Sequence, residues 1–176
     1  LSVGMYNWQG KGKIWRSNDG GLNWNNWFTP TGDNWPDAWS NALWVSPVDT
    51  NLVVFGGMGD LYRCSNAGAV TPAFPQISDW FQYRTDANFR SAHGDQHLIV
   101  SHPDYDGVTN TTVFVVNDGG IQRADNIATV TQTTGWVNLA NHLGIAQFLG
   151  GAASPDGSLI IGGTQDNGTL RYRESD

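Results

Sequence analysis

The chain has 176 residues, a formal net charge of −7 and nine lysine and arginine residues that are scattered along its length. Nucleic-acid binding needs clustered basic residues to neutralise phosphates, so this composition argues against a nucleic-acid partner. No apolar run is long enough to cross a membrane as a helix, and no segment has the order of a signal peptide.

The composition instead favours two classes of protein, which the sequence leaves open. Aromatic residues make up 12% of the chain, with nine tryptophans, and there are 22 glycines. Carbohydrate-binding proteins use tryptophan faces to stack on sugar rings, and amides and carboxylates to bond the hydroxyls. A plain all-β protein with a tryptophan-rich core has the same composition.

Short apolar runs predict strands along the whole chain, and helical periodicity is almost absent. The clearest runs are Leu52–Phe55, Thr112–Val116 and Ser158–Ile161. Each is rich in β-branched or aromatic residues and is bounded by Asn, Asp, Gly or Pro, which is typical of strands separated by turns. We therefore expect an all-β fold.

These runs belong to a repeat. The second, third and fourth units each have a proline (Pro47, Pro103 and Pro155), then a strand, a glycine-rich turn, and a second short run with an arginine, and Lys13–Ser17 is what survives of an earlier copy. The arginines are Arg16, Arg63, Arg123 and Arg171, at spacings of 47, 60 and 48 residues. We place the approximate repeats at 1–40, 41–90, 91–145 and 146–176.

A repeat of this length with several strands is typical of β-propeller blades, which are four-stranded antiparallel sheets. The sequence holds about three to four such blades, whereas propellers have about four to eight. We therefore expect a single propeller segment. The remainder of a larger protein, or other chains, would supply the missing strands.

One turn carries a specific motif, from Ser17 to Trp24. Its residues Ser17, Asp19, Gly21 and Trp24 match the pattern S-x-D-x-G-x-x-W. The motif resembles the Asp box, or BNR repeat, of sialidase-like β-propellers. That resemblance implies a turn at the outer part of a blade and a structural role. Asp19 would accept bonds from turn N–H groups, and Trp24 would pack over the turn.

A wider resemblance runs from Ala92 to Gly168. It rests on three segments in order: His93–His97, Asn117–Gly120 and Gly163–Thr169. They resemble BNR-repeat propellers of the sortilin and xyloglucanase types. The resemblance implies the propeller fold and leaves function open, because such propellers serve as hydrolases, receptors and assembly factors.

A metal site is one interpretation of His93, Asp95 and His97. Alternate residues of a strand face the same side, so the three side chains would share one face. Two imidazoles and a carboxylate suit zinc or another divalent metal. The alternative is a polar strand whose side chains bond neighbouring backbone and water. No other cofactor is expected.

Asp118 is the candidate catalytic residue. Xyloglucanase-type hydrolases, which the segment resembles, place a carboxylate in a similar turn, although Gln122 here stands where they have an aromatic residue. Asp166 occupies the equivalent place in the next repeat. Carboxylates from two blades could act as acid and base on a glycosidic bond. The alternative is that both are turn-forming residues.

Two loops supply candidate ligand-binding residues, Trp35 and Trp39 in one and Arg84 and Arg90 in the other. The tryptophans either stack on a sugar or pack on the sheet, and the arginines could bond a polyhydroxyl or anionic ligand. Cys64, the only cysteine, excludes an internal disulfide and is expected to be a buried, inert thiol.

The sequence therefore predicts a secreted module, extracellular or periplasmic, that recognises a polysaccharide or other glycan. If it is an enzyme, it is a glycoside hydrolase. The alternative function is a non-catalytic propeller for protein binding, adhesion or assembly.

Overall fold

The protein is an all-β structure, described by a computed structural model over residues 12–29, 40–85, 90–140, 146–165 and 168–175. Its strands form four antiparallel sheets of two, three, three and four strands. Within the described ranges the helical content is one short helix, α1 (Trp80–Thr85), and no helix there is long and apolar enough to cross a membrane. The expected all-β class with antiparallel sheets is confirmed.

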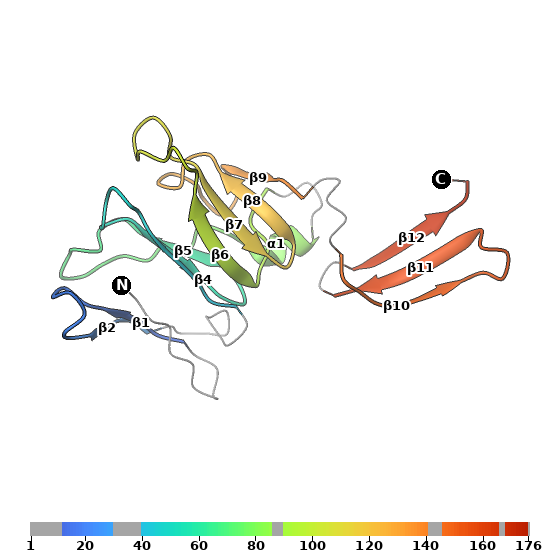
Figure 1. Ribbon diagram of the computed structural model, residues 1–176, viewed down its shortest axis with the longest axis horizontal. Coiled ribbons are helices and arrows are strands. Elements are labelled where there is room, and N and C mark those ends of the chain that lie inside the picture. The colour runs from blue at the N-terminus through green and yellow to red at the C-terminus, as the bar shows by residue number, and fades with distance from the viewer. Residues whose placement is uncertain (1–11, 30–39, 86–89, 141–145, 166–167, 176) are drawn as a thin grey trace. The chain divides into compact units, whose positions relative to one another are not determined.

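The chain divides into two compact units, residues 1–139 and 140–176. The first unit holds three sheets (Figure 1). They are β1 (Ile14–Arg16) with β2 (Asn25–Phe28); β3 (Ala42–Val45), β4 (Val53–Gly56) and β5 (Leu61–Cys64); and β6 (Gln96–Ser101), β7 (Val113–Asn117), β8 (Gly120–Ala124) and β9 (Trp136–Asn138). The second unit is one sheet of β10 (Phe148–Ala153), β11 (Leu159–Thr164) and β12 (Thr169–Arg173).

The three sheets of the first unit pack face to face, and alternation along β4 shows how. Val53 and Phe55 point into a core shared with β1 and β2, whereas Val54 points into a core shared with the β6–β9 sheet. This is the period-two alternation of a strand that is buried on both faces. Cys64 belongs to the first of these cores and is fully buried, as expected.

The β3–β5 sheet continues at its outer edge beyond the three named strands. Arg63 N donates to Pro75 O at 3.0 Å, and Ile77 N donates to Leu61 O at 2.8 Å. Tyr62 and Gln76 form an isolated antiparallel bridge at this edge, where proline, which has no N–H, is tolerated.

The loops that join the first and second strands of a sheet close in the same way in three repeats. Ser46 N donates to Leu52 O at 2.9 Å, His102 N to Thr112 O at 3.0 Å, and Ser154 N to Leu159 O at 2.9 Å. In all three repeats the donor is the residue just before the proline, which is Pro47, Pro103 or Pro155. Loops of different length therefore start and end at equivalent backbone positions.

The repeated arginines also occupy one position in the sheets. Arg63 lies opposite Val54, Arg123 opposite Phe114, and Arg171 opposite Ile161. Two of them reach the neighbouring sheet: Arg16 Nη1 donates to Ala67 O, and Arg63 Nη1 donates to Ile127 O at 3.0 Å and Val130 O at 2.8 Å. The first bond joins β1 to the turn that follows β5, and the second joins β5 to the turn that follows β8.

Candidate functional site

The residues with the Asp-box pattern, Ser17–Trp24, form the turn between β1 and β2, and their bonds are local. Asp19 Oδ1 accepts hydrogen bonds from Asn23 N at 2.9 Å and Ser17 Oγ at 2.8 Å. Gly21 has a φ of +94°, which a side chain would resist, and Trp24 Nε1 donates to its carbonyl at 3.0 Å. The bonds from Asn23 and Ser17 lower the pKa of Asp19 to about 2. The structure thus places all four motif residues in a self-contained turn.

The β7–β8 turn lies at the opposite end of the strands from the β1–β2 turn, and it also contacts a residue outside itself. Asn117 pairs with Gly120, which leaves Asp118 and Gly119 as the loop, and Asn117 Oδ1 accepts the N–H of Gly119 at 3.1 Å. The turn lies against the buried His93 ring, because a Cβ on Gly119 would come within 2.6 Å of His93 Cβ. A side chain at position 119 would therefore displace either the turn or the ring.

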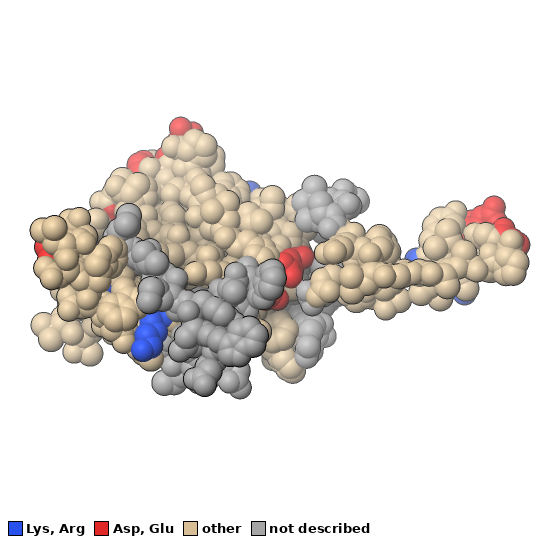
Figure 2. Space-filling model, turned by 60° about the horizontal axis from the view of Figure 1, so that its bottom comes forward, with Lys and Arg blue, Asp and Glu red and all other residues tan. Residues whose placement is uncertain are grey.

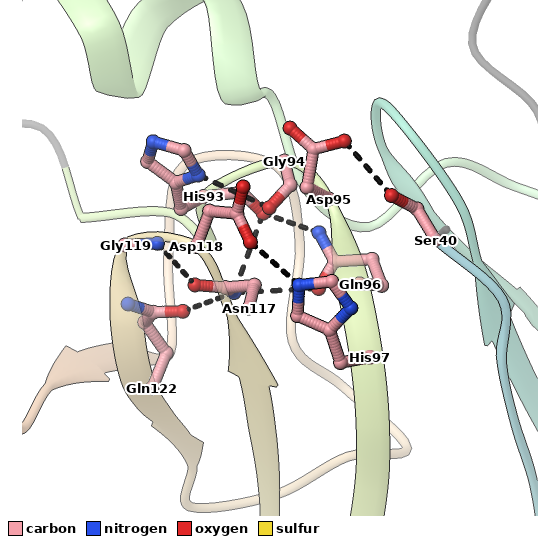
Figure 3. A network of polar contacts seen from close by, with 10 residues as sticks. All are labelled: Ser40, His93, Gly94, Asp95, Gln96, His97, Asn117, Asp118, Gly119 and Gln122. Carbon is pink, nitrogen blue, oxygen red and sulfur yellow. Dashed lines mark hydrogen bonds and ion pairs between the residues drawn. The ribbon is translucent and has the colours of Figure 1, made fainter. Parts of the chain in front are cut away.

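Three buried amides lie beneath this turn, one on each of three adjacent strands (Figure 3). Asn117 Nδ2 on β7 is 2.5 Å from Gln122 Oε1 on β8 and 3.3 Å from Gln96 Oε1 on β6. Gln96 Nε2 in turn donates to the carbonyl of His93. These bonds link the ends of three strands, whereas the Nε2 atom of Gln122 is buried without a hydrogen-bond partner.

His97 and Asp118 form a pair beside these amides (Figure 3). His97 Nε2 is 2.5 Å from Asp118 Oδ1, and the side chains are 42% and 31% exposed. A carboxylate beside an imidazole can orient the ring, accept its N–H and share a proton with a bound group. The pair lies next to the buried amide cluster, and the His97 and Asp118 side chains are exposed enough for a ligand to contact them.

The expected alignment of His93, Asp95 and His97 differs from the structure. β6 begins at Gln96, and Asp95 has a left-handed φ of +57°, so the three residues do not alternate along one strand. His93 Nδ1 is bonded to Gly94 O at 3.0 Å, Asp95 accepts from Ser40 Oγ at 2.9 Å, and His97 contacts Asp118. Over the ranges that the structure describes, no three His, Cys, Asp or Glu side chains gather closely enough to hold a metal ion.

Two backbone bonds explain why this segment departs from a regular strand. Asp95 N donates to Met58 O at 3.0 Å, and Gln96 N donates to Gly57 O at 2.9 Å. The segment is therefore anchored on the β4–β5 turn of the neighbouring sheet, and the backbone turns at Asp95 before β6 begins. The sequence pattern alone carries no sign of these partners.

Asp60, in the β4–β5 turn, is a buried carboxylate that sequence reasoning missed. Its Oδ1 accepts the N–H of Trp80 at 2.8 Å, at the start of α1, and is 3.4 Å from Ser78 Oγ. Burial, with a smaller contribution from the charge of Asp79, raises the pKa of Asp60 to about 6. One sequence signal pointed to Asp60. It is an aspartate in the glycine-rich turn Gly56–Asp60, which stands in its repeat where the β7–β8 turn stands in the next.

The other predicted site residues are only partly placed. Trp35, Trp39 and Asp166 lie outside the described residues. Arg84 is in α1, and its side chain is also outside the described part, while Arg90 is exposed in the segment between α1 and β6. The structure therefore brings Asp118 together with His97 and leaves the two arginines and two tryptophans as predictions.

The amide cluster was also missed, since Gln96, Asn117 and Gln122 read as ordinary strand and turn residues. A signal did exist: all three precede or follow glycine-rich turns in runs that are otherwise apolar.

The sequence matches no protein-family model and no curated protein.

Proposed function

We propose that this chain is part of a secreted Asp-box β-propeller and that its His97–Asp118 edge binds carbohydrate. The observation that carries the proposal is the His97–Asp118 pair, whose atoms are 2.5 Å apart and whose side chains remain partly exposed. Hydroxyl-rich ligands bind to such fixed donors and acceptors, since each hydroxyl both donates and accepts.

The organisation of the sheets supports the propeller part of this proposal. Three antiparallel sheets pack face to face in sequence order, and the turn with the Asp-box pattern lies between β1 and β2. The His97–Asp118 pair lies at the other end of the strands, where the backbone bonds of Asp95 and Gln96 join the start of β6 to the β4–β5 turn. Each feature agrees with the family that the sequence resembles.

The proposed ligand is neutral. On the described part of the face in Figure 2, acidic and basic residues are few and lie among uncharged side chains. A neutral sugar needs hydrogen-bonding groups and apolar surface rather than a charged patch. Hydrolysis at this edge would use Asp118 as an acid or base, as carboxylates act in glycoside hydrolases.

The test is binding and hydrolysis with a panel of neutral polysaccharides. Wild type, Asp118→Asn and His97→Gln are compared for retention in affinity gels and for release of reducing ends. The matched control is Asp104→Asn, which alters a carboxylate that is 86% exposed in the loop after β6. We expect Asp118→Asn to weaken retention about tenfold, because a charge-assisted hydrogen bond is lost, while Asp104→Asn behaves as wild type.

The outcomes separate the parts of the proposal. Reducing ends released by wild type but not by Asp118→Asn would make the protein a glycoside hydrolase, and retention without release would make it a binding module. Equal retention by wild type and Asp118→Asn would place the site elsewhere. No retention of any polysaccharide by folded wild type would overturn the proposal in favour of protein binding or assembly.

A further inference from the structure

A cavity of about 370 Å³ lies between the first two sheets of the first unit. One wall is β1 with the start of the β1–β2 turn, and the other is formed by β3, β4 and the loop between them. Its volume is within the range of roughly 300–1,000 Å³ that is usual for small-molecule pockets. The cavity is at the opposite end of the strands from His97 and Asp118, so it is separate from the proposed carbohydrate site.

The irregular pairing of β1 explains how one short strand supplies much of this wall. Its register against β2 shifts between Ile14 and Trp15, and the three consecutive residues Ile14, Trp15 and Arg16 all line the cavity. A regular strand presents only alternate residues to one side. Bulges of this kind redirect side chains and are common beside functional sites.

Arg16 is positioned in this wall by two contacts that leave most of its donors unused. Its Nη1 donates to Ala67 O, and its Cζ lies 5.8 Å from the centroid of the Trp27 ring. A guanidinium has five N–H donors, and no carboxylate among the described residues pairs with this one. The guanidinium is therefore held in one place with donors available for an acceptor.

The rest of the described wall is uncharged. No Asp or Glu is among the described residues that line the cavity, although the chain has a net charge of −7. Trp27 also lines it, and its Nε1 is buried with no hydrogen-bond partner in the described structure, whereas buried donors are normally bonded. The aliphatic part of the wall consists mainly of Ile14, Leu43, Val45 and Val53. The cavity thus combines unmatched donors, one of them cationic, with aliphatic surface.

We propose that this cavity binds a small monocarboxylate with an aliphatic chain. The carboxylate pairs with the Arg16 guanidinium, whose parallel N–H groups match its two oxygens. The chain lies against Leu43, Val45 and Val53, where it is removed from water. An amine of the same length would meet the like charge of Arg16, and an alcohol would lack the ionic pair. The proposal does not depend on carbohydrate binding.

The test is isothermal titration calorimetry of the full chain with octanoate, and 1-octanol and octylammonium are the matched ligands. All three have the same chain length and differ in the charge of the head group. We expect octanoate to bind at least about tenfold more tightly than 1-octanol, because hydrogen bonds between ionised groups are the stronger ones. Octylammonium should not bind measurably.

A pair of variants at Thr50 tests the place of the site and leaves Arg16 intact. Thr50 is exposed and lines the cavity. Thr50→Asp adds a negative charge to the wall and should weaken octanoate binding at least about threefold through like-charge repulsion, without changing 1-octanol binding. Thr50→Asn is the matched neutral control and should bind octanoate as wild type does.

Arg16→Gln tests the guanidinium itself. It should weaken octanoate binding at least about tenfold and leave 1-octanol binding unchanged, since the ionic pair is lost. The control is Arg123→Gln, which changes an arginine that pairs with Asp125 in another sheet. Circular dichroism and the reactivity of the buried Cys64 thiol report whether each variant is folded. If Arg16→Gln does not fold, the Thr50 pair decides.

Two results would overturn the proposal. One is binding of octanoate by folded wild type that is no tighter than binding of 1-octanol. The other is equal octanoate affinity for Thr50→Asp and Thr50→Asn, or for wild type and a folded Arg16→Gln, which would place the octanoate elsewhere. Neither result bears on retention of polysaccharides, so this proposal and the carbohydrate proposal fail separately.

Discussion

The two ends of the stacked strands use aspartate in opposite ways. At the end with the Asp box, carboxylates bond inside their own turns: Asp19 binds Asn23, and Asp106 accepts the N–H groups of Val108, Thr109 and Asn110. The hydrogen bond from the Thr109 hydroxyl, together with these N–H bonds, holds the pKa of Asp106 well below its usual range. At the other end, Asp60, Asp95 and Asp118 bond residues far away in the sequence.

The difference shows what each end does for the fold. A carboxylate that is satisfied within its own turn stabilises that turn and adds little to the rest of the molecule. A carboxylate or amide that bonds across strands fixes the positions of separate elements, which a binding site needs. Substitutions at the two ends should therefore differ in size and in pH dependence.

The largest expected effect is at the amide cluster. Asn117→Ala removes the side chain that bonds Gly119 N, Gln122 Oε1 and Gln96 Oε1. The buried amide oxygens of Gln96 and Gln122 then lose the donor that Asn117 provides. We expect a loss of about 3 kcal/mol in the free energy of unfolding, since each unsatisfied buried group costs roughly 1–3 kcal/mol. Urea denaturation followed by tryptophan fluorescence measures it.

The matched control is Asn126→Ala, at the other end, where the side chain accepts the N–H of Ala128 in its own exposed turn. That variant should lose about 1 kcal/mol or less. Equal losses for the two variants would contradict the distinction between the ends.

The next effect concerns Asp60 and depends on pH. Burial raises its pKa from 3.8 to about 6, so the protonated form is favoured in the folded state. The cost of ionising it is absent below about pH 4 and grows to at most about 3 kcal/mol as the pH rises through 6. Asp60→Asn keeps an acceptor for Trp80 N–H and cannot ionise.

We therefore expect Asp60→Asn to be more stable than wild type by about 2 kcal/mol at pH 7.5 and no more stable at pH 4. Urea denaturation at both pH values tests this, with Asp104→Asn as the exposed control. A stabilisation that is the same at pH 4 would show that ionisation of Asp60 is not its cause.

The smallest effect is at Asp19, whose pKa is lowered to about 2 by bonds from Asn23 and Ser17. A lowered pKa contributes stability above about pH 4 that is lost as the pH falls through 2. Asp19→Asn should therefore be slightly less stable than wild type at pH 6, and the difference should disappear near pH 2. A difference that persists at low pH would point to lost geometry instead of lost charge.

The strands and the arginine repeat could be predicted from the sequence, because both depend on local patterns. Leu52–Phe55 anticipated β4 to within a residue, and Thr112–Val116 anticipated β7. Three of the four marker arginines, Arg63, Arg123 and Arg171, occupy one register position in their sheets. Short β-branched runs between turn residues leave few alternatives to a strand.

The site could not be predicted in the same way, since its geometry depends on distant partners. Asp118 could be singled out, but its contact with His97 depends on the register of β6 against β7. The metal interpretation assumed a strand from His93, whereas bonds to the β4–β5 turn delay β6 until Gln96. The raised pKa of Asp60 depends on burial under α1, which no local pattern encodes.

The closed loops between the first and second strands have a consequence for engineering. Because one backbone bond at the loop base, such as His102 N to Thr112 O, sets where the strands start, the residues between can change without shifting the sheet. Lengthening a loop costs little, as closure entropy grows only with the logarithm of its length. A peptide epitope or a split-reporter fragment inserted near Val108, which is 84% exposed, should be displayed without disturbing the fold.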